Sequence, residues 1–292
     1  MQKPYFQLHA LVVVLAFTAV LGHLINLSAP VLVSWRTGIA ALVFLLVIRP
    51  KSSPTTAPHT KTALATGILL GAHWMTFFAA IKLSNITICL TGLATTSVFT
   101  ALAEAIQEKR LPRPFELLIG AIMIPSMVMI VGVAETHLLG LLIAIFSAML
   151  AASFTVINKA LVRSGMAPAA ITQYEMLGAF LTCLLTSLTM QLPLAAWIPH
   201  GLDWLWLFIL AIGCTVIAYE WNIKLLRHFS AFETTLAINF EPVYGIIMAA
   251  LLFGEHKQLD PLFLLGAAII LAANFAKPLA ILIKRRKSSS QE

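Results

Sequence analysis

Long apolar runs dominate this sequence and constrain its fold more than any other feature. A helix needs roughly 17–25 mainly apolar residues to cross a bilayer, and ten runs of this kind follow one another along the chain. They lie at about 5–26, 29–48, 61–82, 86–106, 113–132, 137–158, 168–190, 203–223, 231–253 and 261–282. The sequence therefore predicts an all-α membrane protein with ten transmembrane helices.

Composition agrees with this prediction, because 60% of the residues are hydrophobic and only 11% are charged. Soluble domains average about 45–50% apolar and about 25% charged residues. A water-soluble fold of this length has too few charges to cover so much apolar surface. The three cysteines, Cys89, Cys183 and Cys214, lie inside apolar runs without a metal-ligand spacing, so we interpret them as packing residues.

The positions of Lys and Arg predict the topology. With ten spans and both termini cytoplasmic, only Lys82 and Lys257 lie outside, Arg36 lies within the membrane, and the remaining basic residues are internal. Such an excess of internal positive charge is typical of inner-membrane proteins. We therefore expect a multi-pass protein of a bacterial inner (plasma) membrane, with its first run retained as a helix and a basic cytoplasmic tail at 284–292. The net charge of +7 then indicates anchoring at the membrane surface, not nucleic-acid binding.

Short matches between the two halves predict an internal repeat, with copies at 1–134 and 135–283. The segment 34–38 matches 173–178, His73-Trp74 matches Tyr219-Glu220, and Glu108 with Pro114 matches Glu255 with Pro261. Each copy holds five spans, an odd number, so the second copy is inverted in the membrane. Inverted repeats around a midplane site recur in secondary transporters. The alternative is a chance match between apolar helices.

One segment resembles a known family. Residues 236–245 read LAINFEPVYG and are followed by Phe253-Gly254-Glu255, which is similar to EamA-type transporters of the drug/metabolite transporter superfamily. The first half departs from that pattern, because Glu104-Ala105 stands where many relatives have Glu-Pro or Ser-Pro, and Gln107-Glu108 replaces Gly-Glu. The resemblance implies a ten-helix inner-membrane carrier with a central cavity, often an exporter of amino acids or other metabolites.

Two ionisable residues lie inside predicted spans of the two halves. Arg36 and Glu175 each follow their helix start by about seven residues, which puts each roughly 10 Å from its own, opposite membrane face. Buried charges of this kind usually line a cavity or pathway. The Arg36 guanidinium can hold a carboxylate or phosphate; alternatively, Arg36 only fixes the helix bundle. We expect the two side chains to occupy equivalent positions above and below a midplane site, without forming one tight ion pair.

Glu241-Pro242 marks a second candidate site near the middle of the ninth span. Pro242 lacks an N–H, so the carbonyl of Ile238 loses its helical partner, which makes this position a candidate hinge. A buried Glu241 can bind substrate or take up a proton; alternatively, it is a protonated packing residue bonded to Asn239.

Aromatic and polar neighbours complete the set of candidate residues. Their positions beside the buried charges favour substrate binding or gating, whereas the alternative for each aromatic residue is packing or interfacial anchoring, and for His73 hydrogen-bonded packing. The full set of predicted binding or gating residues is Trp35, Arg36, His73, Trp74, Tyr174, Glu175, Tyr219, Glu220, Asn239, Glu241 and Tyr244, with Pro242 as hinge.

Several motifs for other functions are missing from the sequence. There is no GxxxxGK[ST] loop, no HExxH helix and no G-x-S-x-G turn. We therefore expect no enzyme activity, cofactor or metal. The predicted function is secondary transport of small polar or amphipathic metabolites, amino-acid-like above all, in the export direction and with proton coupling and oligomeric state left open. The alternatives are a lipid or lipid-linked sugar flippase, a membrane-embedded lipid-modifying enzyme, and a structural or sensory subunit.

Overall fold

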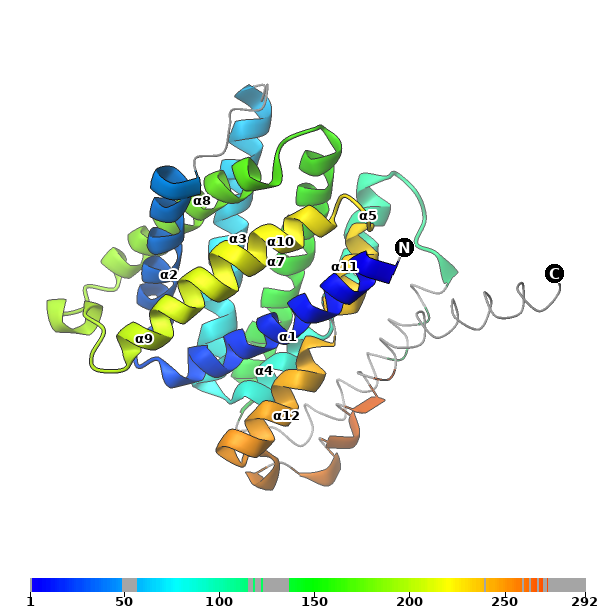
Figure 1. Cartoon of the computed structure of the whole chain (residues 1–292). Coiled ribbons are helices and arrows are strands. Elements are labelled where there is room, and N and C mark those ends of the chain that lie inside the picture. Colours follow the sequence, from blue (N-terminus) through cyan, green and yellow to red (C-terminus); the bar gives the residue numbers. More distant parts are fainter. Residues whose placement is uncertain are drawn as a thin grey trace.

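The chain forms a bundle of helices, shown in Figure 1 as a computed structural model. The structure describes residues 2–48, 57–114, 118, 122, 137–238, 240–258, 260–262, 264–266, 268, 269 and 272. Every regular element within these residues is a helix. The predicted all-α class is therefore confirmed for the described part of the chain.

Six helical stretches are long and apolar enough to cross a membrane, judged by length and composition. The stretches are 6–24, 29–48, 58–83, 86–107, 138–163 and 203–225. Four of these stretches correspond to α1 (Gln2–Leu24), α2 (Ala29–Val43) with its π-helical end Phe44–Ile48, α3 (Ala57–Leu83) and α7 (Leu138–Arg163). The last stretch joins α9 (Asp203–Phe208), the π-helix η4 (Ile209–Ile217) and α10 (Ala218–Leu225).

Helix α8 (Pro168–Thr189) matches the seventh predicted span but is more polar than these six. Short 3₁₀ turns lie at Leu194–Trp197 and Glu255–Gln258. The fifth and tenth predicted spans, 113–132 and 261–282, fall largely outside the described residues, as does the basic tail. Ten helices and an internal repeat thus stay predictions.

Two predicted spans are broken in the middle, which is a correction to the expected continuous helices. The fourth span consists of α4 (Ile86–Leu93) and α5 (Thr96–Gln107), and the ninth consists of α11 (Ala231–Ile238) and α12 (Glu241–Phe253). In both, the second piece begins ten residues after the first piece begins. Each break therefore occurs at the same depth of its span, as an inverted repeat requires.

Local chemistry explains both breaks. Pro242 stands in the first turn of α12 and has no N–H to continue the hydrogen bonds of α11. The first-half break has no proline; there, the hydroxyls of Thr95 and Thr96 donate to the carbonyls of Gly92 (2.7 Å) and Leu93 (2.6 Å). Side-chain hydroxyls that bind local carbonyls compete with the helical bonds in this way. The second piece of each broken span packs on the first piece of the other, α12 on α4 and α5 on α11 (Figure 1).

Glycines bring α3 and α8 into close contact. A Cβ added to Gly67 would run into the backbone of Glu175, and one added to Gly178 would run into the carbonyl of Leu64. Small residues at helix contacts allow backbones to approach closely inside a membrane. This contact sets Glu175 of α8 against α3, the helix that carries Trp74.

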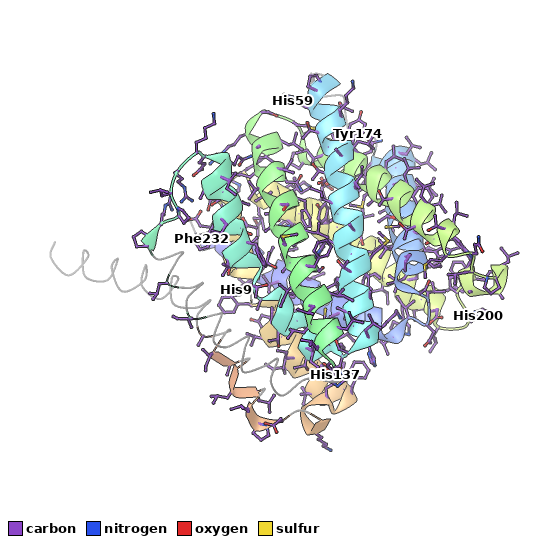
Figure 2. All side chains as sticks on the ribbon, turned by 180° about the vertical axis from the view of Figure 1, so that it is seen from behind. His9, His59, His137, Tyr174, His200 and Phe232 are labelled. Carbon is purple, nitrogen blue, oxygen red and sulfur yellow. The ribbon has the colours of Figure 1, made fainter. Side chains whose placement is uncertain are left out.

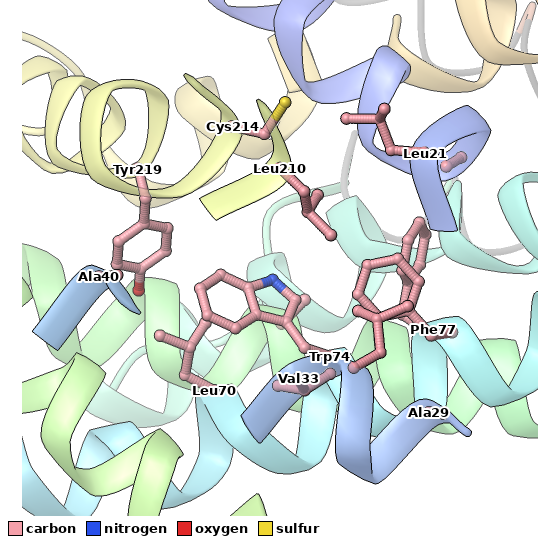
Figure 3. Close-up of a cluster of buried hydrophobic side chains, with 14 of the residues drawn as sticks. Leu21, Ala29, Val33, Ala40, Leu70, Trp74, Phe77, Leu210, Cys214 and Tyr219 are labelled. Atoms are coloured by element: carbon pink, nitrogen blue, oxygen red, sulfur yellow. The ribbon is translucent and has the colours of Figure 1, made fainter. Parts of the chain in front are cut away.

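Apolar side chains fill the centre of the bundle and also cover its outside. Figure 3 shows Val33, Leu70 and Leu210 around the ring of Trp74, with Leu21 farther away in the same buried cluster. Large apolar side chains on the outer surface include Leu185 (63% exposed) and Leu251 (80% exposed). Figure 2 places His59 and His137 at opposite ends of the molecule. Apolar side chains exposed on the outside of a helical bundle are what a bilayer would cover.

Candidate functional site

A central cavity of about 90 Å³ lies where the broken helices meet the rest of the bundle. Its walls come from α1, α2, α3, α4, α5, α7, η4, α10, α11 and α12. The polar side chains that line it are Thr18, Arg36, His73, Thr96, Thr155, Tyr219, Asn222, Thr235 and Glu241. Pro242 lies beside Glu241 in the same wall. The cavity therefore gathers residues from both halves of the chain.

Arg36 of α2 is almost fully buried, at 1% exposure, yet contributes to the cavity wall. Its Nε donates to Thr215 Oγ1 at 2.5 Å, and one terminal nitrogen donates to the Cys214 carbonyl at 3.4 Å. The guanidinium lies 3.8 Å from the centre of the Trp74 ring, a cation–π arrangement. The other terminal nitrogen has no hydrogen-bond partner among the described residues. Arg36 is thus held on one side and has a donor available for a ligand.

The π-helical stretch η4 supplies the hydrogen-bond acceptors for Arg36. Thr215 Oγ1 donates to Leu210 O at 2.8 Å, five residues earlier, so its lone pairs remain for Arg36. A π-helix shifts the backbone hydrogen bonds and often marks a functional position. Here η4 presents a hydroxyl and a carbonyl to one guanidinium.

Glu241 adds an acidic side chain to the same cavity. It begins α12, is 7% exposed and lines the same cavity as Arg36. Within the described part of the chain, no hydrogen bond or ion pair engages its carboxylate, although it lies close enough to Arg36 for an electrostatic attraction. The first turn of a helix favours negative charge because the peptide dipoles point their positive ends there. The cavity therefore contains a guanidinium and a carboxyl group that do not bond to each other.

Tyr219 connects this cavity to a second carboxyl group. Its ring packs edge-on against Trp74, with the ring centres 5.5 Å apart (Figure 3). Its hydroxyl donates to Glu175 Oε2 at 3.1 Å and accepts from Asn158 Nδ2 at 3.2 Å. Glu175 is fully buried and does not line the cavity. Arg36 and Glu175 form no ion pair in this structure; Trp74 and Tyr219 lie between them.

Comparison with known proteins decides the family. Residues 138–282, from the start of α7 to the end of the tenth predicted span, match the model of the EamA-like transporter family. These residues, the second half of the chain, belong to the EamA-like transporter family. This family is part of the drug/metabolite transporter superfamily, so the sequence resemblance is confirmed and the chain is a multi-pass membrane protein of a transporter family.

A solved crystal structure shares the fold of this EamA-like chain. The two superpose with a TM-score of 0.63 at 18% sequence identity, over 97% of each chain. At that identity, the likeness concerns the fold alone. No curated protein matches the sequence at a significant level.

His73 lies in the cavity wall of this EamA-like protein, one residue before Trp74. Its Nδ1 lies 2.8 Å from the hydroxyl and 3.0 Å from the carbonyl of Ser147, and the Ser147 hydroxyl also contacts the His73 carbonyl at 2.9 Å. These contacts tie α3 to α7. They fit hydrogen-bonded packing, the alternative considered for this residue.

Four other predicted residues lie away from the cavity. Glu220 pairs with Lys224 at 2.8 Å, within its own helix, and Trp35 donates from Nε1 to Trp197 O at 2.8 Å. Tyr174 and Tyr244 are half-buried outside the cavity lining. Glu220 follows Tyr219 directly, and successive residues on a helix point about 100° apart. Asn239 lies outside the described residues.

Small polar residues in the wall escaped the sequence analysis. Thr96, Thr155 and Thr235 each donate to a carbonyl of the preceding turn. Threonine does this anywhere in an apolar helix, so its presence in the sequence carries no signal for a cavity. Asn222 and Asn158 are different, because an amide inside a membrane helix needs a partner and could have been singled out on that ground.

Proposed function

We propose that this chain is a secondary transporter that moves small zwitterionic, amino-acid-like metabolites across a bacterial inner membrane by alternating access, in the export direction. One observation carries the proposal: Arg36 and Glu241 line one buried cavity without pairing with each other. An ionised group inside a membrane costs about 2.5–3.5 kcal/mol on insertion scales, so its retention points to function.

A zwitterion fits these two groups. Its carboxylate can accept from the Arg36 nitrogen that has no described partner, and its ammonium can donate to the Glu241 carboxylate. The two protein charges are then neutralised by one ligand. The walls between them are aromatic, with Trp74, Phe77 and Phe154 in the lining, so an apolar substituent on the ligand meets an apolar surface.

The size of the cavity supports a cycle of opening and closing. Pockets for small ligands usually enclose about 300–1,000 Å³, whereas this cavity measures about 90 Å³. A ligand enters only when the walls move apart. The breaks between α4 and α5 and between α11 and α12 lie at this cavity and provide places for such movement.

The observation that could favour a flippase is an apolar groove of about 480 Å³ between α2 and α8. Trp35, Leu42 and Phe180 are among its walls, and the groove lies apart from Arg36 and Glu241. Among the described residues that line it, none carries a charge that could hold a lipid headgroup. We therefore favour the soluble zwitterion over the lipid as substrate.

Flux measurements test the proposal. Protein purified and reconstituted in liposomes should exchange labelled amino acids from a mixed pool without ATP. Arg36→Gln and Glu241→Gln should each lower the flux at least about tenfold, because a charge-assisted hydrogen bond contributes about 1.5–3 kcal/mol.

The matched control is Glu220→Gln, the same chemical change at a carboxylate that pairs with Lys224 outside the cavity. It should keep the parent's rate. Parent-like flux in both cavity variants would show that the site is assigned wrongly. Lipid movement without amino-acid flux would favour the flippase.

A further inference from the structure

The two broken helices cap each other, and this exchange points to a gating role for two glutamates. Glu255, just after α12, accepts from the backbone N–H groups of Ile86 (3.1 Å) and Thr87 (2.9 Å), the first two residues of α4. It also accepts from the Thr87 hydroxyl at 2.7 Å. The carboxylate is 4% exposed. The end of one broken span thus closes over the start of the other.

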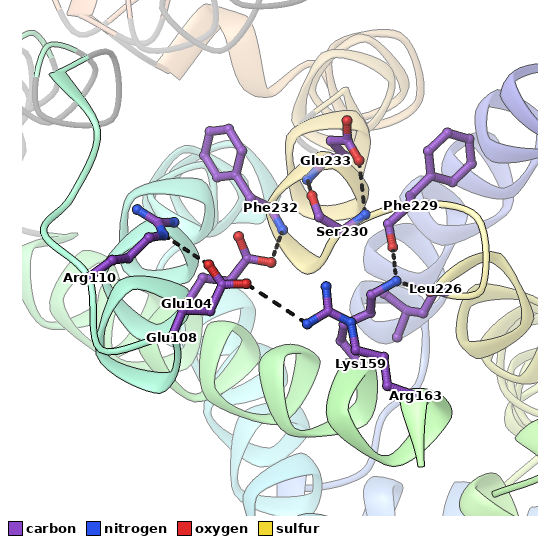
Figure 4. A network of polar contacts seen from close by, with 10 residues as sticks. All are labelled: Glu104, Glu108, Arg110, Lys159, Arg163, Leu226, Phe229, Ser230, Phe232 and Glu233. Carbon is purple, nitrogen blue, oxygen red and sulfur yellow. Dashed lines mark hydrogen bonds and ion pairs between the residues drawn. The ribbon is translucent and has the colours of Figure 1, made fainter. Parts of the chain in front are cut away.

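Glu104 makes the corresponding contact at the other end of the bundle. From the last turn of α5, it accepts from the N–H of Phe232, the second residue of α11, at 3.2 Å (Figure 4). Its side chain is also buried. Each carboxylate therefore caps the helix start that belongs to the other half of the chain.

This arrangement differs from the sequence alignment of the two halves. The sequence pairs Glu108 with Glu255, but Glu108 binds Arg110 at 2.9 Å and lies 3.9 Å from Arg163 (Figure 4). Glu104, one helical turn earlier, faces α11 instead. In the first half of the chain, the residue that caps a helix start as Glu255 does is therefore Glu104, not Glu108.

The physical reason for the two caps is the unpaired N–H groups at a helix start. The first four N–H groups of a helix have no partner within it, and leaving them unpaired away from water is costly. Each helix also has a local cap: Asn85 accepts from the N–H of Ile88 at 2.8 Å, and Ser230 exchanges hydrogen bonds with Glu233. A cap from the other half can therefore break without unfolding the helix, provided that water reaches the freed N–H groups.

We propose that the Glu255 and Glu104 caps are alternating gate contacts: each keeps its own end of the cavity closed and breaks when that end opens. On the predicted topology, the Glu255 cap closes the outside and the Glu104 cap closes the inside. Both are intact here, where the cavity is small. The inference rests on the proposed alternating access.

The test measures access to the cavity from each side. Cys214 lines the cavity and serves as the reporter in the full chain carrying Cys89→Ala and Cys183→Ala. A membrane-impermeant maleimide is applied from either side of oriented vesicles, without substrate. Glu255→Gln should raise the ratio of outside to inside labelling about tenfold, and Glu104→Gln should lower it by a similar factor.

Two controls leave both caps in place. Glu108→Gln removes a carboxylate at the same end as Glu104, and Asp260→Asn removes one whose hydrogen bond among the described residues is local, to the N–H of Leu262 at 2.7 Å. Both should label like the parent. The double variant Glu104→Gln/Glu255→Gln should return the ratio to the parent's value, because the two opposing shifts cancel.

Several results would overturn the inference. They are an unchanged ratio in both single variants, a shift toward the same side in both, and a double variant that does not restore the ratio. If a Gln variant fails to insert, Glu255→Asp and Glu104→Asp, which keep the charge but shorten the reach, should shift the ratio in the same opposite directions. Labelling needs no substrate. Shifted labelling without amino-acid flux would therefore reject the proposed substrate but still support the two gate contacts.

Discussion

At the level of single residues, Tyr219 contacts both the cavity and a buried polar group outside it. Its ring forms part of the cavity wall beside Trp74, while its hydroxyl lies between Asn158 and Glu175 outside the cavity. One oxygen of Glu175 has no partner among the described residues. The hydroxyl of Tyr219 therefore links this buried carboxyl group to the cavity wall.

Removing this hydroxyl should destabilise the protein and slow transport. Tyr219→Phe keeps the ring against Trp74 but leaves polar atoms of Glu175 and Asn158 without a partner, at a cost of about 1–3 kcal/mol. Thermal unfolding in detergent and amino-acid flux measure the two effects. Tyr174→Phe, a half-buried tyrosine outside the cavity, is the control and should match the parent. A Tyr219→Phe protein as stable and active as the parent would contradict the assignment.

At the level of elements, backbone contact between α3 and α8 positions this group of residues. Gly67 and Gly178 lie where any side chain would meet the backbone of the facing helix. The contact holds Glu175 within hydrogen-bonding distance of Tyr219. Tyr219 in turn packs against Trp74, and Trp74 packs against Arg36. The geometry of the site thus depends on two glycines that touch no substrate.

Gly67→Ala should lower the stability of the protein by about 1–3 kcal/mol, the usual cost of overpacking. The denaturation midpoint in detergent measures it. Gly213→Ala is the matched control, because a Cβ at Gly213 meets nothing within 4 Å and alanine favours a helix over glycine. Gly213→Ala should be neutral or stabilising. Equal effects from both variants would mean that the close approach of α3 and α8 is unimportant.

At the level of the whole molecule, the exterior is apolar and the charged residues Arg36 and Glu241 are enclosed. Exposed leucines such as Leu185 and Leu251 cover the outside, whereas these two charges face the inside. This is the reverse of a soluble protein and matches a carrier whose polar path is hidden from lipid. The distribution of Lys and Arg then orients the molecule.

Both chain ends should lie on the cytoplasmic side. The ten predicted spans, an even number, and the excess of basic residues on their predicted internal side lead to this expectation. A fluorescent or enzymatic reporter fused in turn to each end measures the sidedness, and a reporter inserted beside Lys82, in a predicted external loop, provides the control of opposite sign. Ends on opposite sides of the membrane would contradict the ten-span topology.

Much of this account follows from residue types and their order. The apolar runs identify a membrane protein because only lipid can cover so much apolar surface, and a charge inside such a run marks a site because its burial is costly. Arg36 and Glu241 were found on these grounds, Trp74 and Tyr219 as aromatic residues at matching places in the two halves, and all four line the cavity. The segment around Glu241-Pro242 was also enough to indicate the family.

Other features depend on contacts between residues far apart in the chain. The break at Ala94-Thr95 has no proline to indicate it, and the choice of Glu104 over Glu108 as a cap depends on which turn of α5 lies against the start of α11. Glu220 and Tyr219 are neighbours in sequence, but only one reaches the cavity. Apolar helices of similar composition can rotate or break with little change in their pattern of residues. Their facing sides are therefore set by packing against the other half of the chain.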